Sequence, residues 1–391
     1  MMAVARLIQT LWQGQQRWSR LAWLLLVPFA LGFSALVRTR NALYDWRLLP
    51  IRRATPKVIS VGNLTVGGSG KTPFVLWLAQ ALQQRTHYRI AILTHGYKGS
   101  RSDTTAVGAG GEIRATPAEV GDEAVMLARS FSGVVIAGKN RLKAAQLASQ
   151  DFASELVILD DGFQHRRLTR DVDLLLIAGR QDRPGLDRQW LLPAGPSREP
   201  PSAARRADMV IVTKGGQPTG LEPDRAEPPL FSADLVPTSL VESGQGDWQE
   251  LSLSLLHRRR VLAVAGIADP APFYALLQEH DAELTEVMSF ADHHTYTQAD
   301  WQTIVTIGRR CDLIVTTEKD LVKLERFPFP TGKLVALRVR MQVRNAECLL
   351  SRIERQLAHQ TEKMDDDHPR KKRPSSIFHG LIWPRRSSSK P

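Results

Sequence analysis

Cysteine is nearly absent from this chain of 391 residues. Its two cysteines, Cys311 and Cys348, lie far apart, and neither belongs to a C-x-x-C motif or has a histidine partner at metal-ligand spacing. A disulfide framework and a cysteine-based zinc site are therefore excluded. We expect both residues to be buried thiols in a reducing compartment.

Aromatic residues make up only 7% of the chain, and no stretch interleaves them with lysine and arginine. Such interleaving is typical of proteins that stack single-stranded nucleic acid on aromatic side chains. The formal net charge is nevertheless +12, which favours an anionic partner: nucleic acid, phosphorylated lipid or an acidic membrane surface. Nucleic acid is the weaker candidate, and the N-terminus indicates a membrane.

Charged residues are absent from Leu21 to Val37, an apolar segment with arginines on both sides. As a helix it would be about 25 Å long, slightly short of the roughly 20 residues that span a bilayer. Pro28 and Gly32 would bend it, and Trp18 and Trp23 suit the headgroup region. The segment predicts an uncleaved helix that contacts the membrane; a true span, a signal peptide and a core helix are the alternatives.

A glycine-rich turn follows the short apolar stretch at residues 57–61. Residues 66–72 read V-G-G-S-G-K-T, which matches a phosphate-binding loop except that Thr65 stands where the strict pattern has glycine. Such a turn aims backbone N–H groups and the positive end of a helix dipole at one point. Lys71 would contact the outer phosphates and Thr72 would ligate Mg²⁺, so the predicted ligand is a nucleoside triphosphate. A plain tight turn before a helix is the alternative.

Strand and helix patterns alternate after this loop, which predicts an α/β fold: a P-loop NTPase-type parallel sheet with helices on both faces. A second, smaller α/β unit follows, and the end of the chain is polar and basic. The expected division is a membrane-associated helix at 1–42, a P-loop domain at 43–232, a smaller α/β domain at 233–358 and a disordered basic tail at 359–391.

Two pairs of carboxylates stand where they can act in chemistry. Asp160 and Asp161 end an apolar strand, and in a phosphate-loop enzyme a strand beside the loop delivers an Asp to the Mg²⁺ shell. Asp122 and Glu123 begin an apolar helix, where one carboxylate could take the proton from an attacking hydroxyl. The alternatives are a strand that simply turns after Asp160, and capping or dipole roles for Asp122 and Glu123.

Two adjacent histidines, His293 and His294, follow Asp292 in the smaller unit. No other His or Cys has the spacing of a zinc site, so we expect one imidazole to hydrogen-bond a carboxylate and tune it as a base. A surface or structural pair is the alternative. The segment at residues 316–320, T-T-E-K-D, is distantly similar to the base-recognition element of GTP-binding proteins. Candidate phosphate contacts among the cations are Arg141, Arg166, Arg167 and Arg198.

Five motifs occur in a fixed order: Gly62–Pro73 (G-N-L-T-V-G-G-S-G-K-T-P), Gly121–Ala124 (G-D-E-A), Asp160–His165 (D-D-G-F-Q-H), Leu192–Pro200 (L-P-A-G-P-S-R-E-P) and Phe290–His294 (F-A-D-H-H). Together they closely resemble the tetraacyldisaccharide 4′-kinases, the lipid A 4′-kinases of Gram-negative bacteria. The resemblance extends from the apolar N-terminal helix to about residue 357. Thr65 fits the loop of this family, so it no longer counts against phosphate binding.

The resemblance implies an ATP-dependent lipid kinase. It would transfer the γ-phosphate of ATP to the 4′-hydroxyl of a tetraacylated glucosamine disaccharide 1-phosphate, giving lipid IVA, at the cytoplasmic face of the inner membrane. ATP and Mg²⁺ would be the cofactors. The partners would be the lipid-linked disaccharide and the inner membrane surface, with no nucleic acid and no obligatory protein partner.

Residue roles follow from the resemblance by position. Asp122 would be the catalytic base, with His293 as its partner, Glu123 nearby and Lys71 on the phosphates. Thr72, Asp160 and Asp161 would order the metal. The nucleotide and the reaction centre would be lined by Thr65, Val66, Gly67, Gly68, Ser69, Gly70, Lys71, Thr72, Arg141, Gln164, Arg198 and Glu199.

One departure from the family affects a predicted phosphate contact, because His95 stands where the family usually has an arginine.

The resemblance also has a consequence for domain motion. If Asp122 and His293 form a pair, the smaller domain must close over the P-loop domain, which predicts a hinge between them. The rival readings are a membrane-associated P-loop GTPase or ATPase switch and a scaffold without catalysis.

Overall fold

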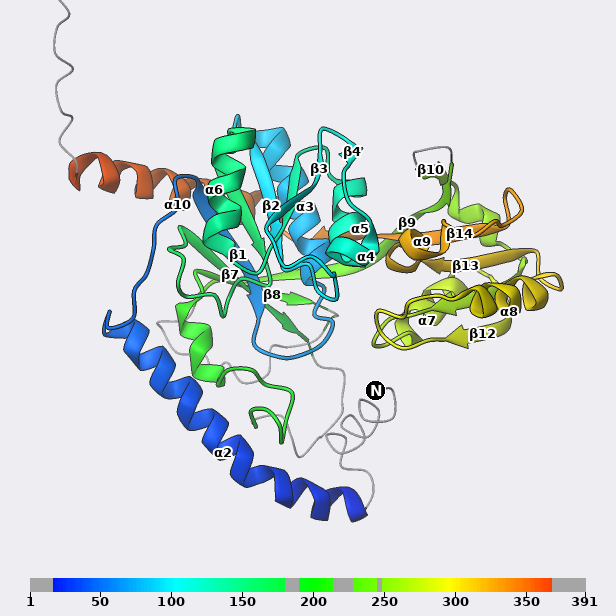
Figure 1. The fold of residues 1–391 in the computed structure, drawn as a ribbon, viewed down its shortest axis with the longest axis horizontal. Helices are drawn as coiled ribbons and strands as arrows, with labels where there is room; N and C mark the ends of the chain where they lie inside the picture. Colours follow the sequence, from blue (N-terminus) through cyan, green and yellow to red (C-terminus); the bar gives the residue numbers. More distant parts are fainter. Residues whose placement is uncertain (1–16, 180–189, 214, 216–227, 245–247, 368–391) are drawn as a thin grey trace, which may run out of the picture.

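The structure, a computed structural model, describes residues 17–179, 190–213, 215, 228–244 and 248–367. Its strands form one continuous 14-stranded sheet that runs through two α/β units (Figure 1). The strand order is β12-β11-β13-β14-β9-β8-β7-β1-β6-β2-β5-β3-β4, with β10 added on β9. One sheet therefore connects the P-loop domain to the smaller domain.

The centre of the P-loop domain is a parallel sheet. Its strands are β1 (Lys57–Asn63), β2 (Ile90–Thr94), β5 (Val134–Ala137), β6 (Leu156–Asp160), β7 (Val172–Ala178) and β8 (Met209–Thr213). The short strands β3 (Thr105–Ala109) and β4 (Glu112–Ile113) add an antiparallel edge. Every residue of β2, β6 and β8 is buried, as expected for parallel strands covered on both faces.

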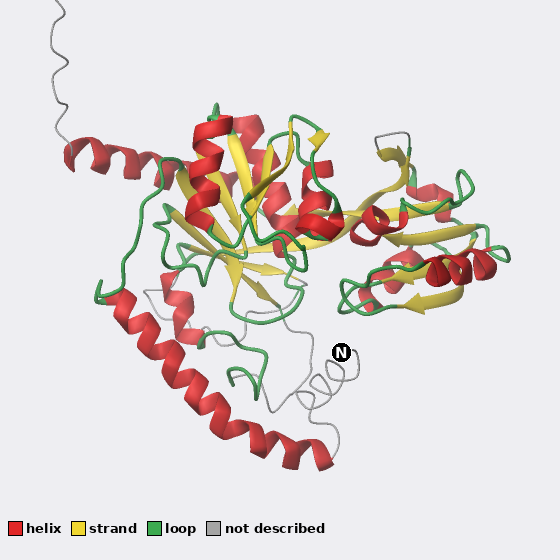
Figure 2. Cartoon of the chain, viewed as in Figure 1, coloured by secondary structure: helices red, strands yellow, loops and turns green. Residues whose placement is uncertain are grey.

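Helices cover both faces of this sheet (Figure 2). They are α3 (Lys71–Arg85), α4 (Pro117–Val120), α5 (Asp122–Ser130) and α6 (Arg141–Phe152), with a 3₁₀ turn η1 (Pro201–Arg206). Alternate side chains of β1 explain the two layers: Ile59 and Val61 pack in the cluster with α3 and α5, whereas Val58 packs in the cluster with α6. The predicted α/β fold is confirmed.

The smaller domain repeats the α/β pattern at the other end of the sheet (Figure 1). It contains β9 (Leu230–Ser243), β10 (Trp248–Leu251), β11 (Arg260–Ala265), β12 (Glu283–Ser289), β13 (Leu313–Thr317), β14 (Leu334–Val343), α7 (Ala271–Glu279), α8 (Gln298–Gly308), α9 (Glu318–Leu324) and the 3₁₀ turn η2 (Leu253–Leu256). Strands β12, β11, β13 and β14 are parallel. Helix α9 starts directly after β13, so its first turn lies at the C-terminal edge of that strand.

The long antiparallel pair β9–β14 links the two domains. Phe231 of β9 and Met341 of β14 belong to the core of the P-loop domain, whereas Leu240 and Leu337 of the same strands belong to the core of the smaller domain. Two strands thus carry all the regular backbone pairing between the cores in the described part of the chain. The hinge between the domains stays a prediction, and this ribbon is the backbone connection on which it would act.

The last helix, α10 (Ala346–Asp367), returns to the P-loop domain. Leu349, Leu350, Ile353 and Leu357 are buried in the core cluster that also contains α3, although the predicted division placed them in the smaller domain. The predicted tail also begins too early, because α10 continues to Asp367. Residues 360–364, Q-T-E-K-M, are mostly good helix formers that extend an amphipathic helix. Residues 368–391 of the predicted tail lie outside the described residues.

The α10 contact gives a stability prediction. We expect Ile353→Ala to lower the free energy of unfolding by about 2 to 5 kcal/mol, because it removes a fully buried side chain from the P-loop core. Urea unfolding measures the change. Arg352→Ala, at an exposed neighbouring position, is the matched control and should change stability by less than about 0.5 kcal/mol. Equal effects of the two variants would contradict the packing of α10 against this core.

The two cysteines differ in exposure. Cys311 is buried, as predicted, but Cys348 is exposed, so the prediction for Cys348 is wrong. The reason is helical periodicity: Cys348 precedes the buried Leu349 and Leu350 and lies on the solvent side of α10.

Helix α2 (Arg17–Asp45) is one continuous helix that includes Pro28 and runs along one side of the molecule (Figure 1). Its inner side chains recur at helical spacing and are buried: Ala30, Val37, Asn41 and Tyr44. Its outer face exposes large apolar side chains: Leu24, Leu25, Phe29, Leu31 and Leu36. By length and composition, Trp23–Asp45 is sufficient to cross a membrane, with a mean hydropathy of 1.3 and 11% of the apolar window buried. The low burial argues against a core helix.

Candidate active site

The phosphate loop connects the end of β1 to the start of α3. Gly67 and Gly70 have positive φ angles of 116° and 77°, which favour glycine. A Cβ atom added at Gly67 or Gly68 would meet nothing within 4 Å, so the loop presents open backbone. Gly70 is the N-cap of α3, and no side chain caps that helix. The uncapped N–H groups and the helix dipole are therefore available to an anion.

Thr65 shows why the first glycine of the strict pattern is not needed here. It forms an isolated antiparallel bridge with Ser197. The Val66 N–H donates to the Pro196 carbonyl at 2.8 Å, and the Arg198 N–H donates to the Leu64 carbonyl at 2.7 Å. This part of the loop is thus extended backbone. Residues with side chains adopt that conformation readily, so glycine is not required at position 65. The segment at residues 196–198 braces the phosphate loop, which joins two of the predicted motifs.

Asp160 and Asp161 lie beside the phosphate loop, because β6 pairs directly with β1. The Thr72 hydroxyl donates to Asp160 at 3.3 Å, and Lys71 Nζ lies 3.6 Å from Asp161 Oδ1. Arg198 donates two hydrogen bonds to Asp161, each of 2.8 Å. Burial raises the pKa of Asp161, but these hydrogen bonds and the charge of Lys71 outweigh it and lower that pKa overall. Asp161 is therefore anionic.

The surroundings of Asp160 fit a bound cation. Burial, and after it the charges of Glu123 and Asp161, raise the pKa of Asp160 to about 7. Its Oδ1 atom and Oε1 of Gln164 are buried and have no hydrogen-bond partner among the described residues. A divalent cation would satisfy such oxygens and favour the ionised carboxylate. No cluster of three or more His, Cys, Asp or Glu side chains occurs in the described ranges, but Mg²⁺ on phosphates needs only one or two carboxylates.

The other predicted lining residues have different surroundings. Arg141 is buried and donates to the carbonyls of Gly138 at 2.6 Å and Asp160 at 2.9 Å, so it fixes the ends of two central strands. Gln164 donates to the Asn63 carbonyl at 2.9 Å. Both residues therefore stand at the C-terminal edge of the sheet, next to the loop.

Glu199 is placed elsewhere, between α2 and η1. It is 1% exposed, accepts a hydrogen bond from Asn41 at 2.8 Å and pairs with Arg206 at 2.9 Å. Arg166, a candidate phosphate contact, also binds α2, through the Asn41 carbonyl at 3.0 Å and Asp45 at 2.6 Å. These two side chains join α2 to the P-loop domain, and in the described structure neither contacts the phosphate loop.

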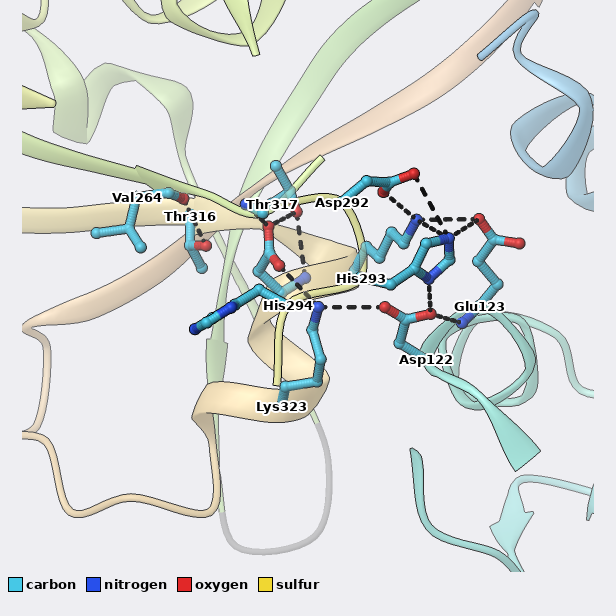
Figure 3. Close-up of polar contacts among 12 residues, drawn as sticks. Asp122, Glu123, Val264, Asp292, His293, His294, Thr316, Thr317 and Lys323 are labelled. Carbon is cyan, nitrogen blue, oxygen red and sulfur yellow. Dashed lines mark hydrogen bonds and ion pairs between the residues drawn. The ribbon is translucent and has the colours of Figure 1, made fainter. Parts of the chain in front are cut away.

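Asp122 and His293 meet across the two domains (Figure 3). Asp122 is the first residue of α5, and His293 lies in the loop after β12 with a positive φ of 56°. His293 Nδ1 lies 2.8 Å from Asp122 Oδ1, and the Tyr97 ring packs 5.0 Å from the His293 ring. Gly121 has a φ of 90°, and an added Cβ would lie 2.4 Å from the Tyr97 carbonyl oxygen. The predicted pair is present, and His293 is held in it from several sides.

Two lysines of α9 complete this cluster, and the sequence interpretation missed them. Lys319 Nζ lies 3.1 Å from Glu123 Oε1 and 3.1 Å from His293 Nε2. Lys323 Nζ lies 3.1 Å from Asp122 Oδ2. Burial raises the pKa of Asp122, but the His293 hydrogen bond and the two lysine charges hold it well below its usual range. The available signal was the T-T-E-K-D segment, which contains Lys319, together with Lys323 four residues later, because residues at this spacing share one face of a helix.

The remaining predicted residues differ in their position. His294 points away from Asp122: it binds Asp300 at 3.0 Å and stacks on Phe290 at 4.7 Å. His95 follows β2 at the edge where the phosphate loop lies. Burial, and after it the charges of Arg141 and Lys139, lower the pKa of His95. A neutral His95 does not replace the charge of the arginine usual in the family.

Comparisons with known proteins extend over both domains. A sequence model described as tetraacyldisaccharide-1-P 4′-kinase matches residues 22–358. The tetraacyldisaccharide 4′-kinase of Syntrophus aciditrophicus is 38% identical over 346 residues, which are 82% of this chain and 90% of that protein. The enzyme of the same name from Pelobacter propionicus is 41% identical over 307 residues, 77% of this chain and 82% of that protein.

A solved structure has the same fold. LpxK from Aquifex aeolicus, in a crystal structure with ATP, superposes with a TM-score of 0.69 and 33% sequence identity. The match covers 85% of this chain and 98% of that chain. The residues matched by the sequence model, 22–358, include the phosphate loop, the Asp160–Asp161 pair and the smaller domain that carries His293.

Proposed function

This chain belongs to the tetraacyldisaccharide-1-P 4′-kinase family, and we propose that it transfers the γ-phosphate of ATP to the 4′-hydroxyl of a tetraacylated glucosamine disaccharide 1-phosphate. The product is lipid IVA, an intermediate of lipid A and lipopolysaccharide biosynthesis. The observation that carries the proposal is the hydrogen bond between Asp122 and His293, which joins the two domains at the expected catalytic base.

The reaction requires a positioned acceptor and cationic charge around the γ-phosphate. Asp122 accepts the proton of the 4′-hydroxyl while the hydroxyl oxygen bonds to the γ-phosphorus. The bond from that phosphorus to the β-γ bridging oxygen breaks, and ADP leaves. His293 orients the Asp122 carboxylate by its hydrogen bond, and Lys71 supplies charge to the phosphates.

A magnesium ion fits the residues beside the loop. The Thr72 hydroxyl and the free oxygen of Asp160 would hold it, and Asp161 and Gln164 would support it. When bound, it would neutralise charge between the β- and γ-phosphates. Arg198 would keep Asp161 in place through its two hydrogen bonds.

The alternative function, a P-loop GTPase or ATPase switch, is not favoured. The family match includes the smaller domain as well as the loop. The switch function also does not explain the buried pair between Asp122 and His293. A slow hydrolase needs no base positioned by a second domain.

Transfer of label tests the proposed function. Purified protein is incubated with ATP labelled at the γ-phosphate and with the glucosamine disaccharide lipid in detergent. We expect label on the lipid, at the 4′ position after hydrolysis of the sugar. Label released only as inorganic phosphate would overturn the proposal and favour a hydrolytic switch.

Helix α2 supports a membrane-bound location. Its outer face is apolar, and it is tied to the P-loop domain at two points along its length: Trp23 donates to the Ala194 carbonyl at 2.8 Å, and Asn41 donates to Glu199 at 2.8 Å. A helix fixed at two separate points along a folded domain cannot cross the bilayer between them without that domain. We therefore place α2 in one leaflet, at the cytoplasmic face of the inner membrane where ATP is present.

The double variant Leu25→Glu/Phe29→Glu tests this location. Each exposed side chain would contribute about 1.5 to 3 kcal/mol when buried in lipid, so we expect more than about 100-fold weaker binding to anionic vesicles. Sedimentation with vesicles measures the loss, and activity on detergent-solubilised lipid should persist. Arg47→Glu, at an exposed position just after α2, is a control for charge alone. Undiminished vesicle binding by the double variant would contradict the proposal.

A further inference from the structure

Lys319 has a complete set of acceptors. A lysine ammonium carries three N–H groups. Lys319 Nζ lies 3.1 Å from Glu123 Oε1, 3.1 Å from Asp292 Oδ1 and 3.1 Å from His293 Nε2. Its side chain is 15% exposed. Burial lowers the pKa of Lys319, but the charges of Glu123, Asp122 and Asp292 outweigh it and raise that pKa overall, so the ammonium stays charged.

Lys323 stands one helical turn further along α9. Its Nζ lies 3.1 Å from Asp122 Oδ2 and 3.0 Å from Asp320 Oδ1, and 5.5 Å from the centre of the Tyr296 ring. Its side chain is 11% exposed. Asp122 is therefore held at both oxygens, by His293 on Oδ1 and by Lys323 on Oδ2 (Figure 3).

We propose that Lys319 and Lys323 are positioning residues for the phosphate transfer: Lys319 fixes the tautomer of His293, and Lys323 keeps the Asp122 carboxylate anionic and oriented. The inference rests on the proposed function, because it assigns a role around the base of that reaction. Both lysines come from the smaller domain, whereas Asp122 and Glu123 come from the P-loop domain. The contact between the two domains therefore brings the two charges to the base.

The tautomer follows from the donors. A charged Lys319 can only donate, so His293 Nε2 is the acceptor and the ring proton lies on Nδ1. That proton is donated to Asp122 Oδ1. The other ring form would place an N–H group against the ammonium. Lys319 thus directs the imidazole N–H of His293 toward Asp122. Because both ring nitrogens are then engaged, the proton of the substrate hydroxyl goes to the Asp122 carboxylate.

The charge state follows from the groups that face Asp122. Helix α5 contributes Glu123 beside it, and the loop after β12 contributes His293, which has Asp292 next to its ring. Helix α9 contributes Lys319 and Lys323, and Lys323 also pairs with Asp320. Loss of one lysine removes a positive charge from this group and raises the pKa of Asp122. The base is active as the anion, so the acid limb of the pH profile must move to higher pH.

The experiment compares Lys319→Met, Lys323→Met and Lys323→Arg in the full chain, with transfer of label to the lipid as the assay. Lys333→Met is the matched control, because this half-buried lysine of the smaller domain donates to the carbonyls of Cys311 and Asp312 and does not touch Asp122. We expect each Met variant to lower kcat by about 10-fold to 100-fold. KM for ATP should change little.

Three readouts separate positioning from stability. In Lys323→Met the acid limb of the kcat–pH profile should move to higher pH by about 1 to 3 units, and Lys323→Arg should restore its parental position. In Lys319→Met, ¹⁵N NMR of labelled histidines should show His293 leaving the Nδ1–H form, with His293→Gln assigning the signal. Lys333→Met should keep the parental pH profile even if its melting temperature falls.

Parental kcat and an unmoved pH profile in both Met variants would overturn the inference, as would losses no larger than that of Lys333→Met. An insoluble Met variant is replaced by Lys319→Gln or Lys323→Gln, which remove the same charge. The NMR signal needs no lipid substrate. Absence of lipid label in the unaltered protein would therefore overturn the proposed function, whereas a His293 tautomer that ignores Lys319 would overturn this inference alone.

Discussion

Replacement of Asp122 by Asn should lower kcat for lipid phosphorylation by about 10²- to 10⁴-fold, the range of a general base. The Asn side chain has nearly the same shape but cannot accept the proton of the 4′-hydroxyl. It also leaves Lys323 facing a neutral amide at the position of Asp122 Oδ2. ATP binding should remain, because the described contacts of the phosphate loop involve other residues. Single-turnover transfer of label and nucleotide titration measure the two effects separately.

A second Asp–His pair in the same domain provides the control. His294 Nε2 lies 3.0 Å from Asp300 Oδ2, a distance close to that of the proposed catalytic pair, yet this pair lies within the smaller domain. Asp300→Asn should cost some stability, because Asp300 also caps α8, and should leave kcat nearly unchanged. Retained activity in Asp122→Asn, or an equal loss in Asp300→Asn, would remove the base assignment.

Much of the P-loop half of the site was predictable because it depends on local sequence and strand order. Apolar strands that alternate with helices give a parallel sheet, and such a sheet places the residues after β1 and β6 at one edge. The contact of Thr72 with Asp160 follows from that arrangement. The pairing of Asp122 with His293, in contrast, was expected only from the resemblance to the family, because no pattern in the chain relates residues so far apart.

The parts that were not predicted depend on packing between distant segments. Lys319 and Glu123 are 196 positions apart, and their contact requires the register of β9 on β14 to set the distance between the domains. The return of α10 is equally non-local, since its apolar face fits either core by composition. Glu199 stands next to Arg198 in one motif, yet the two side chains diverge because neighbours on an extended backbone point in opposite directions.

Lys71 is the other residue at which we expect a large effect. Its Nζ lies 3.6 Å from Asp161 Oδ1, and Arg198 holds the same carboxylate with two shorter bonds. Lys71 can therefore turn to a phosphate at little cost, because Asp161 keeps a cationic partner. Lys71→Met should leave the fold intact and Asp161 paired with Arg198, but it removes the point charge from the phosphates. We expect kcat to fall by about 10²- to 10³-fold and KM for ATP to rise.

Steady-state transfer of label at several ATP concentrations measures both constants, and Lys57→Met is the matched control. Lys57 is the first residue of β1, whereas Lys71 comes after its last residue, so the two lysines lie toward opposite ends of this strand. Lys57 donates to the Tyr88 hydroxyl at 2.7 Å and to the Leu357 carbonyl at 3.1 Å, so its loss should lower the melting temperature and spare kcat. If Lys57→Met and Lys71→Met reduced kcat equally, the loss would reflect β1 and α10 packing, and Lys71 would have no special part in phosphate binding.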